Sequence, residues 1–391
     1  MKLKRLDDLL VRGKKVFCRV DFNVPIKDGK VTDDLRIESA LPTIKYLLKE
    51  GATVILASHL GRPDGKPVEK YSLEPVAVVL SKLLDMEIVF IHDCVGDDVK
   101  ARVDKLAPGQ VALLENLRYH AEEEANDPEF ARQLASLADA YVDDAFAVAH
   151  RSHASVVGIP KLLPHAAGRL IEAEVDTLTG LLTKPNHPFV AIIGGAKISD
   201  KIAFMQNLMK KADTIIIGGA MANTFLAAQG HDMGSSIQEQ KSHKLALDIL
   251  DSAKHHGVEI VMPVDVVVAD ALDSKTSRIV TVGQLEDKDI ALDLGPATST
   301  LINEALHGAE TVFWNGTLGY TEEPAFAIAS HALAQTLIHS KANTVIGGGD
   351  TAGYVDGAGM HDDFGFISTG GGAALELLAG KKLPAVEALR D

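Results

Sequence analysis

The sequence contains little cysteine, few aromatic residues and no long hydrophobic run. Only 2 cysteines and 1 tryptophan occur among 391 residues, and aromatic residues make up 5% of the chain. Cys18 and Cys94 stand inside or next to apolar β-like runs, so we expect buried, inert thiols in a reducing compartment rather than a disulfide framework. Because no run of about 18 apolar residues occurs and the N-terminus is charged throughout, we expect a cytoplasmic protein with no membrane partner.

Common nucleotide- and metal-binding motifs are missing as well. There is no GxxxxGK[ST] and no GxGxxG followed by an acidic residue, which argues against P-loop NTPases and ordinary Rossmann dinucleotide binders. The motifs HExxH, paired CxxC and GxSxG are also absent. His255 and His256, like His150 and His153, lack the partners that a metal site needs.

The charge balance is strongly negative. There are 39 Lys and Arg residues against 54 Asp and Glu residues, which gives a formal net charge of −15. Such a field repels polyanions, so nucleic acid is not an expected partner. The content of 46% hydrophobic and 24% charged residues is typical of a globular protein. At roughly 150 residues per domain, the length favours two domains.

Short β-branched runs alternate with helical patterns along the chain, which predicts an α/β protein with two doubly wound, Rossmann-like parallel sheets. The runs are continuously apolar, as in parallel strands that helices cover on both faces, and ligands bind beyond the carboxyl ends of such strands. The predicted strands are VFCRVD, ATVILAS, EIVFI, QVALLEN and AYVDDAF in the first half, then FVAIIGG, TIIIGG, EIVMP, TVFWNG and NTVIGGG in the second.

A helical pattern from Leu170 to Lys184 separates the two sets of strands. It ends before Pro185 and Pro188, where a new strand pattern begins. We therefore predict one domain over residues 1–170, a connecting helix over 171–187 and a second domain over 188–379.

Arginine and glycine are distributed unevenly between these halves. Ten of the twelve arginines precede the boundary, whereas every glycine doublet and triplet follows it. Five arginines of the first half lie at or near strand ends, where guanidinium groups can converge on a phosphate. The alternative is a set of independent surface ion pairs. The five are Arg19, Arg36, Arg62, Arg118 and Arg151.

Polar residues follow the first two strands. Asp21 and Asn23 flank Phe22, so in an extended segment their side chains point the same way and can hydrogen-bond a hydroxyl group. An Asx turn before Pro25 is an equally good interpretation. His59 in SHLGRP follows the second strand, and a single histidine there is more often structural than catalytic.

In the second half, GGAKISDKIAFMQNLMKKAD predicts a strand, a glycine turn and a helix. We expect Ser199 to cap this helix, with Asp200 at its start and Lys201 in its first turn. A lysine in that turn opposes the helix dipole unless a phosphate binds at the helix N-terminus, where Lys197 can reach the same anion. The alternative is two lysines that only lie along the surface.

Two further glycine clusters follow strand patterns. In VIGGGDTAG, backbone N–H groups can approach phosphates while Asp350 holds a hydrated Mg²⁺. In STGGGAALELLAGKK, the glycines at 370–372 open a helix that ends near Gly380. Each cluster alone is a weak signal, because glycine turns are common at strand ends.

Ten motifs in order along nearly the whole chain resemble the phosphoglycerate kinase family. They are RVDFNVP, DDLRI, SHLGRP, ENLRYH, DDAFAVAHRSHAS, GGAKISDK, DLGPAT, FWNG, GGGDT and STGGGAALELL. The resemblance implies reversible phosphoryl transfer between 1,3-bisphosphoglycerate and MgADP, giving 3-phosphoglycerate and MgATP. It also implies a monomer with hinge-bending closure, in which residues 1–170 bind the acid, 188–379 bind the nucleotide and the tail 380–391 rejoins the first domain.

The resemblance further implies a role for each matching residue. The acid is bound by Asp21, Phe22, Asn23, Arg36, His59, Leu60, Gly61, Arg62, Arg118 and Arg151. Charge on the transferred phosphoryl group is stabilised by Arg36, Lys197, Gly371 and Gly372. The nucleotide is bound by Lys201, Gly219, Leu294, Glu322, Gly348, Gly349, Asp350 and Thr351, with Asp350 also serving Mg²⁺.

The chain departs from the family pattern in two of its motifs. The usual WNGPxGVFE has Thr317 in place of the proline and Thr321 in place of the phenylalanine, and Phe366 replaces a histidine before STGGG. Altered kinetics are expected rather than lost chemistry, because every charged residue assigned above is present. Two alternatives stay open: a nucleotide-binding or scaffolding protein without turnover, and another ATP-dependent kinase of small carboxylates.

Overall fold

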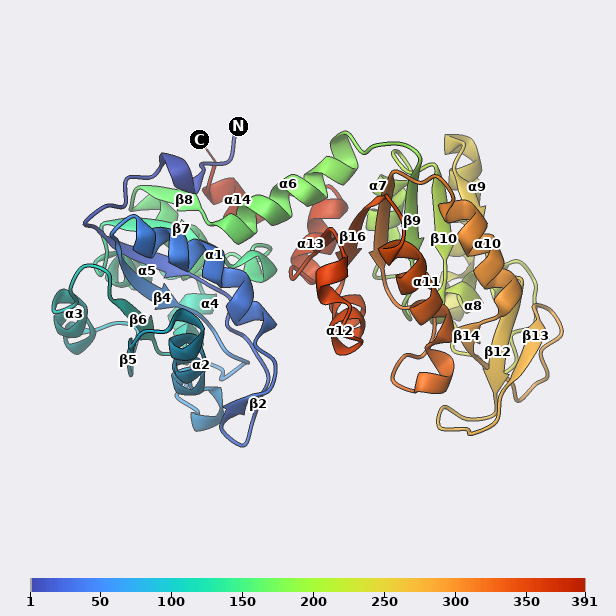
Figure 1. The fold of residues 1–391 in the computed structure, drawn as a ribbon, viewed down its shortest axis with the longest axis horizontal. Coiled ribbons are helices and arrows are strands. Elements are labelled where there is room, and N and C mark those ends of the chain that lie inside the picture. Colours follow the sequence, from blue (N-terminus) through green and yellow to red (C-terminus); the bar gives the residue numbers. More distant parts are fainter. Residues whose placement is uncertain (1, 391) are drawn as a thin grey trace. The chain divides into compact units, whose positions relative to one another are not determined.

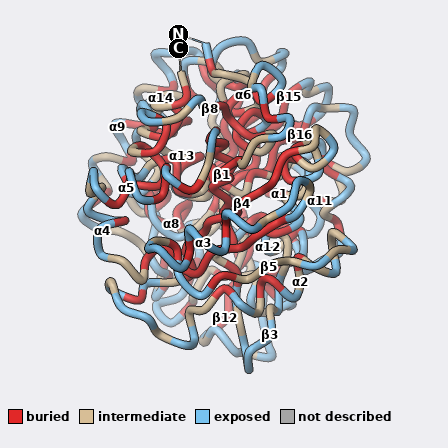
Figure 2. The backbone as a smooth tube through the Cα atoms, turned by 90° about the vertical axis from the view of Figure 1, so that its left-hand side faces the viewer, coloured by how far each residue is buried: buried red, intermediate tan, exposed pale blue. Residues whose placement is uncertain are grey.

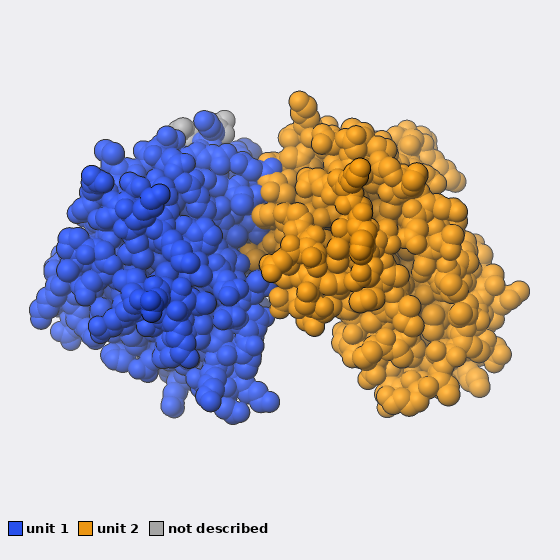
Figure 3. All heavy atoms as spheres, in the orientation of Figure 1, with its two compact units in different colours: residues 1–176, 382–391 blue, residues 177–381 orange. Residues whose placement is uncertain are grey.

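A computed structural model describes residues 2–390 of the chain. The chain forms two compact units, unit 1 with residues 1–176 and 382–391 and unit 2 with residues 177–381 (Figure 3). Helix α6 (Arg169–Thr183) contains the first boundary between them. In unit 1 the returning C-terminal segment meets the N-terminal one, where the Lys4 amide donates to the Leu389 carbonyl over 2.9 Å.

Unit 1 is built on a six-stranded parallel sheet in the order β5-β6-β4-β1-β7-β8 (Figure 1). Cys18 pairs with Leu56 across β1 and β4, and Ile91 pairs with Leu114 across β5 and β6. The strands are β1 Lys15–Arg19, β4 Thr53–Ala57, β5 Ile88–Ile91, β6 Val111–Leu114, β7 Ala140–Asp143 and β8 His165–Ala167. A small hairpin, β2 Ile26–Lys27 and β3 Lys30–Val31, follows β1.

The strands of unit 1 bury side chains on both faces, because successive residues of a strand point to opposite sides of the sheet. Val16 and Cys18 pack with the apolar stripes of α1 (Leu35–Lys49) and α2 (Glu74–Leu84). Phe17 and Arg19 belong to the other face, where the Phe17 ring stacks 6.1 Å from that of Tyr141. Figure 2 shows β1 and β4 as buried strands.

Unit 2 carries a second six-stranded parallel sheet, in the order β11-β10-β9-β15-β16-β17. Counted along the chain this is the order 3-2-1-4-5-6 of dinucleotide-binding folds, in which ligands bind where the order reverses, between β9 and β15. The strands are β9 Phe189–Ile193, β10 Thr214–Ile217, β11 Glu259–Val261, β15 Thr311–Asn315, β16 Asn343–Gly347 and β17 Phe366–Ile367.

Unit 2 also contains a three-stranded antiparallel sheet in the order β13-β12-β14. Its strands are β12 Asp265–Ala269, β13 Arg278–Thr281 and β14 Ile290–Leu294. The Leu294 side chain joins the core beneath α10 (Pro296–Leu306) and α11 (Ile328–Ile338), together with Ile192 and Trp314 of the parallel sheet. The antiparallel sheet thus adds a wall beside the carboxyl ends of β9 and β15.

The helices begin and end at recognisable capping residues. The Asp127 carboxylate accepts from the amides of Glu129 and Phe130 at the start of α5, and Gly257 in the left-handed region ends α9. The other helices of unit 1 are α3 Asp97–Asp104, α4 Ala121–Glu124, α5 Pro128–Ala135 and α14 Pro384–Ala388. Those of unit 2 are α7 Ile202–Leu208, α8 Gly219–Ala228, α9 His243–His256, α12 Gly349–Gly357 and α13 Gly372–Leu378.

The predicted fold class and all ten predicted strands are confirmed. Cys18 and Cys94 are buried free thiols, as expected, and burial raises the pKa of both. None of the helices within residues 2–390 is long and apolar enough to span a bilayer. Two short edge strands, β8 and β17, and the whole antiparallel sheet were not predicted.

One helix boundary was predicted wrongly. Helix α7 begins at Ile202 and not at Ser199, whose hydroxyl donates to Glu239 over 2.8 Å. Lys201 occupies the capping position before the helix, so it does not stand in the first turn against the dipole. The Glu239 carboxylate also accepts from the amides of Ile198 and Ser199, and these bonds hold the segment in a turn.

Asp144, directly after β7, is expected to make unit 1 less stable as the pH rises. It is fully buried, and burial raises its pKa to about 7. Stability from this carboxyl is complete below the unfolded pKa of about 4 and is lost as the pH rises toward 7. Between about pH 5 and pH 7.5 the loss should be about 2–3 kcal/mol, since one pKa unit corresponds to about 1.4 kcal/mol.

Substitution of Asp144 by Asn should remove this loss. One carboxylate oxygen of Asp144 accepts from the Leu170 amide over 2.8 Å, and hydrogen bonds from Thr43 and the Ile171 amide act against the effect of burial on its pKa. The side-chain oxygen of an asparagine can still accept from the Leu170 amide. Urea midpoints of D144N and of the exposed control D273N, measured at both pH values, provide the test. An equal pH dependence in wild type and D144N would contradict the prediction.

Candidate active site

Polar side chains gather beyond the carboxyl ends of β1 and β4 in unit 1. Asp21 accepts a hydrogen bond from Arg36 in α1, and it also accepts from the Asn23 amide over 3.2 Å. The Asn23 side-chain oxygen accepts from the Gly61 amide over 2.9 Å and so ties the loop after β1 to the loop after β4. The Asx turn considered from the sequence is therefore present, together with an ion pair between Asp21 and Arg36.

His59 lies at the centre of this cluster as a buried side chain. Its Nδ1 atom is 3.4 Å from Arg19 and 3.7 Å from a carboxylate oxygen of Asp21. Burial, and then the charges of Arg19, Arg118 and Arg36, hold its pKa well below the usual range. The imidazole is neutral at physiological pH, so it can offer a hydrogen bond but no cationic charge.

Arg19 does not face a ligand, contrary to expectation. It is fully buried, its Nε atom donates to the Ser155 hydroxyl over 2.9 Å, and a terminal nitrogen donates to the Val20 carbonyl. The Ser155 hydroxyl in turn donates to the buried carboxylate of Glu123 over 2.5 Å, and the Ser155 amide donates to its other oxygen. Arg19 thus supports the cluster from inside the unit.

Arg118 does reach the cluster, on the short helical turn Leu117–Tyr119 after β6. It donates to the Gly61 carbonyl over 3.0 Å, and its Nε lies 3.1 Å from the Glu124 carboxylate. Arg151 is exposed, and its charge helps to lower the pKa values of Arg118 and of His153, so it lies close to both. Arg62 is exposed and takes part in none of the side-chain bonds or ion pairs found among residues 2–390.

Phe22 and Leu60 take part in the polar cluster through their backbone groups and not through their side chains. Both side chains are buried in the core of unit 1. The Phe22 amide donates to the Ser58 hydroxyl over 2.8 Å, and the Asn116 side chain bonds both the amide and the carbonyl of Leu60. Asn116 stands two residues after β6 in the motif ENLRYH, and this position was its only signal in the sequence.

In unit 2 the glycine-rich turns after β9 and β15 touch each other. A Cβ atom on Gly316 would lie 2.3 Å from the Gly194 carbonyl group, and one on Gly194 would lie 2.2 Å from the Thr317 oxygen. The Thr317 hydroxyl donates to the Gly319 carbonyl over 3.1 Å, so this turn is hydrogen-bonded without the proline of the family pattern. Side chains are excluded here, which leaves backbone groups free to approach a ligand.

Substitution of Gly316 by Ala is expected to destabilise unit 2 by about 1–3 kcal/mol. Its φ of +98° is unfavourable for alanine, and the new Cβ would collide with backbone atoms that cannot turn away. Gly353→Ala in α12 is the matched control, because that site has open space around it and helical alanine is favoured. Thermal midpoints of both variants measure the effect; equal midpoints would refute it.

Lys201 lies between these two turns. Its Nζ atom donates to the Gly194 carbonyl over 2.7 Å and to the backbone and side-chain oxygens of Asn315 over 3.2 and 2.6 Å. Burial lowers its pKa to about 8, although Asp350 and Asp200 act in the opposite direction. Lys201 is therefore not a surface lysine. Asn315, which ends β15, was not singled out in the sequence.

Lys197 and the starts of two helices complete this region. Lys197 is exposed, and its charge contributes to the lowered pKa of Glu239. Asp350 is exposed in the first turn of α12, and the buried Thr351 hydroxyl accepts from the Gly316 amide over 2.6 Å. Gly348 precedes α12 and Gly371 precedes α13, both with positive φ, and Gly349 and Gly372 are the first residues of these helices.

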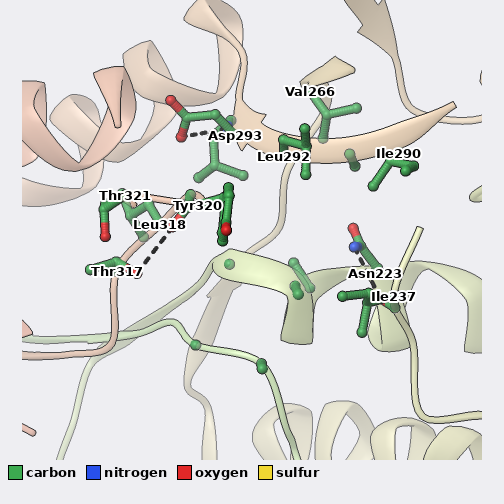
Figure 4. A pocket seen from close by; sticks show the side chains of 18 of the residues that line it. Asn223, Ile237, Val266, Ile290, Leu292, Asp293, Thr317, Leu318, Tyr320 and Thr321 are labelled. Carbon is green, nitrogen blue, oxygen red and sulfur yellow. Dashed lines mark hydrogen bonds between the residues drawn. The ribbon is translucent and has the colours of Figure 1, made fainter. Parts of the chain in front are cut away.

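A cavity of about 290 Å³ opens beside these turns (Figure 4). Val266, Ile290 and Leu292 of the antiparallel sheet form one wall, which is apolar. The loop after β15 forms a second wall. Of the predicted nucleotide residues, Gly219, Leu294, Glu322 and Asp350 line it, whereas Lys201, Gly348, Gly349 and Thr351 do not.

Asp293 on the cavity wall was not predicted. Burial raises its pKa to about 6, although it accepts from the amides of Leu294 and Ala329. Glu323, the neighbour of Glu322 in the chain, is not part of the lining and lies 3.9 Å from Lys275. The cavity is thus apolar along one wall, with carboxylates at its edge.

Comparison with known proteins identifies the family of the chain. The phosphoglycerate kinase family model matches residues 6–381. A phosphoglycerate kinase of Moorella thermoacetica is 51% identical over 387 residues, covering 99% of this chain and 98% of that protein, and one of Pelotomaculum thermopropionicum is 50% identical over the full length of both. The phosphoglycerate kinase structure from Coxiella burnetii superposes with a TM-score of 0.90 at 39% identity, covering 99% of each chain. Because these matches extend over both units, the chain belongs to the phosphoglycerate kinase family.

Proposed function

We propose that this protein is the glycolytic enzyme that transfers a phosphoryl group reversibly from 1,3-bisphosphoglycerate to MgADP. The observation that carries the proposal is the cationic cluster of unit 1, in which Arg36 and Arg118 surround a neutral His59. A kinase of unphosphorylated carboxylates has no need for such a cluster, because its substrate lacks a phosphate remote from the reacting end.

In unit 1, the loops after β1, β4 and β6 are proposed to bind the acid. Asp21 and Asn23 hold the glycerate hydroxyl and carboxyl end, with the backbones of Phe22, Leu60 and Gly61. The bonds among Asn23, Gly61 and Arg118 fix these loops before the ligand arrives. The 3-phosphate is assigned to His59, Arg62, Arg118 and Arg151.

In unit 2, the glycine turns and the cavity are proposed to bind the nucleotide. The apolar wall with Gly219 and Leu294 suits the adenine, and the exposed Glu322 suits the ribose hydroxyls. Lys201, Thr351 and the backbone of Gly348 and Gly349 are assigned to the phosphates. The neighbouring carbonyl groups of Gly194 and Asn315 hold the Lys201 ammonium group in position.

Asp350 is the proposed Mg²⁺ ligand. Its carboxylate is exposed, stands in the first turn of α12 and lines the cavity, so it can bind a cation that keeps several waters. When bound, the ion neutralises charge on the nucleotide phosphates.

The chemistry needs positioning and charge stabilisation rather than proton transfer. The bond between phosphorus and the acyl oxygen breaks while a bond to a β-phosphate oxygen of ADP forms, so the leaving group is a carboxylate and requires no acid. In reverse the acceptor is already a carboxylate and requires no base. Charge on the transferred phosphoryl group is assigned to Arg36, Lys197 and the amides of Gly371 and Gly372.

We also propose that the enzyme is a cytosolic monomer whose two units close together around residues 170–188. Each unit has a complete core and its own ligand loops, which supports a motion of one unit against the other. Small-angle scattering should give a smaller radius of gyration with both substrates than with either alone. An unchanged radius would argue against closure.

Trapping of the acyl phosphate tests the reaction directly. Purified protein with MgATP, 3-phosphoglycerate and hydroxylamine should yield a hydroxamate, and no product should form when glycerate or acetate replaces 3-phosphoglycerate. Product from acetate would favour a kinase of small carboxylates. Nucleotide binding by calorimetry without any hydroxamate would favour a protein that binds nucleotide without turnover.

A further inference from the structure

Three side chains of different chemistry converge beyond the carboxyl ends of β5 and β6 in unit 1, outside the proposed substrate site. Asp93 and Cys94 lie in the loop after β5, and His120 precedes α4. One potential ligand atom from each residue lies within 4.8 Å of the other two. We propose that Asp93, Cys94 and His120 form a binding site for a single Zn²⁺ ion.

The donor set selects the class of metal. A cysteine sulfur, an imidazole nitrogen and a carboxylate oxygen together suit Zn²⁺, whereas Mg²⁺ and Ca²⁺ prefer oxygen ligands alone. Cys94 is fully buried, His120 is 27% exposed and Asp93 is 53% exposed, so the site runs from the interior to the solvent. Water can therefore fill the fourth position of a tetrahedron.

The backbone already orients two of the ligands. The Asp93 carboxylate oxygen that lies 2.7 Å from His120 Nε2 also accepts from the Cys94 amide over 2.7 Å. The His120 ring packs 5.3 Å from the ring of Phe130, which restricts its motion. With Zn–S of about 2.3 Å and Zn–N of about 2.0 Å, neighbouring ligand atoms must lie roughly 3.3–3.6 Å apart. Side-chain movements of about 1 Å meet this requirement.

The surroundings carry negative charge. Besides Asp93, the buried carboxylates of Glu115 and Glu123 lie near Cys94. A bound Zn²⁺ would offset the charge of these carboxylates, and a coordinated thiol loses its proton to the solvent.

The position of the site means that a bound ion would affect the stability of unit 1. It would link the loop after β5 to His120, which stands two residues beyond Arg118 in the chain. Zinc should therefore stabilise unit 1 against unfolding, by an amount that increases with the logarithm of the zinc concentration above its dissociation constant.

Cobalt(II) and zinc titrations of the metal-stripped full-length protein test the proposal. Cobalt should bind at one equivalent per chain and produce a thiolate-to-cobalt charge-transfer band, which zinc then abolishes, and millimolar Mg²⁺ should not compete. Substitution of Cys94 by Ser should remove the band, and the surface variant H120Q should weaken zinc affinity about tenfold or more in calorimetry. Zinc should raise the thermal midpoint of the wild type but not of H120Q.

The matched controls are Cys18→Ser, at the other buried cysteine, and His92→Gln, at an exposed histidine beside the site. Both controls should bind zinc like the wild type. The proposal is overturned if no charge-transfer band appears, if the band survives in C94S, or if H120Q binds zinc as tightly as H92Q. Should C94S fail to fold, the affinities of H120Q and D93N decide, and wild-type affinity in both rejects the site. None of these readouts depends on kinase activity.

Discussion

Substitution of Arg36 by Ala is expected to lower kcat by about 10²- to 10⁴-fold, by analogy with the roughly 10³- to 10⁵-fold effects of arginine fingers. The guanidinium group is the proposed partner of the charge that spreads over the transferred phosphoryl oxygens, and this charge is greatest in the transition state. Arg36 is partly exposed while its partner Asp21 is buried, so part of the guanidinium remains accessible to a ligand.

Two controls separate this role from a purely structural one. Arg12 is an exposed arginine, and Arg12→Ala should leave kcat unchanged. Arg36→Ala also leaves the buried Asp21 carboxylate without its ion pair, so KM for 3-phosphoglycerate should rise together with the fall in kcat. Arg36→Lys keeps a positive charge but not the planar guanidinium group, so its kcat should lie between those of the wild type and of Arg36→Ala. A change in kcat below threefold, with chemistry rate-limiting, would remove Arg36 from the mechanism.

The sequence was sufficient to predict the parallel sheets, because their strands are continuous apolar runs. It failed where strands are short or context-dependent. Strand β8 is the tripeptide His165–Ala167 and β17 is the dipeptide Phe366–Ile367, and neither forms a run. The antiparallel strands β12 and β13 do contain β-branched runs, VVVA and RIVT, so the sequence carries a signal for these two strands.

The sequence predicts which residues lie at the strand ends, but it does not predict the direction in which each side chain points. Asp21 and Arg19 are two residues apart, yet one accepts from Arg36 at the cluster while the other is enclosed. Arg19 binds Ser155, which is 136 residues away in the chain, and no local pattern announces such a partner. Glu123 was equally hidden, because it stands in a run of three glutamates whose two other members are exposed.

Substitution of Glu123 by Gln is expected to destabilise unit 1 by about 3 kcal/mol, at the lower end of the range for breaking a buried charge pair. Glu123 and Arg19 are both fully buried and are bridged by the Ser155 hydroxyl. The two oxygens of Glu123 accept from the Ser155 hydroxyl and from the Ser155 amide. Glutamine has only one accepting oxygen, so its NH2 group would face one of these two donors. Asp143 also lies near Arg19, because the Arg19 charge acts to lower the pKa of that carboxyl. This second carboxylate beside Arg19 keeps the loss of stability below the upper end of the range.

A double-mutant cycle distinguishes this pairing from two independent packing effects. Glu122→Gln changes the exposed neighbour in the same helix and should shift the urea midpoint of unit 1 very little. Arg19→Met alone leaves the Glu123 carboxylate buried without its cation, so it should also destabilise, whereas the double variant R19M/E123Q should be more stable than the sum of the single losses implies. Additive losses would mean that the Ser155 bridge carries no coupling. A coupling of 1 kcal/mol or more, roughly the value for groups in one network, would establish that Glu123 and Arg19 stabilise unit 1 as one connected pair, and Arg19 in turn lies 3.4 Å from His59.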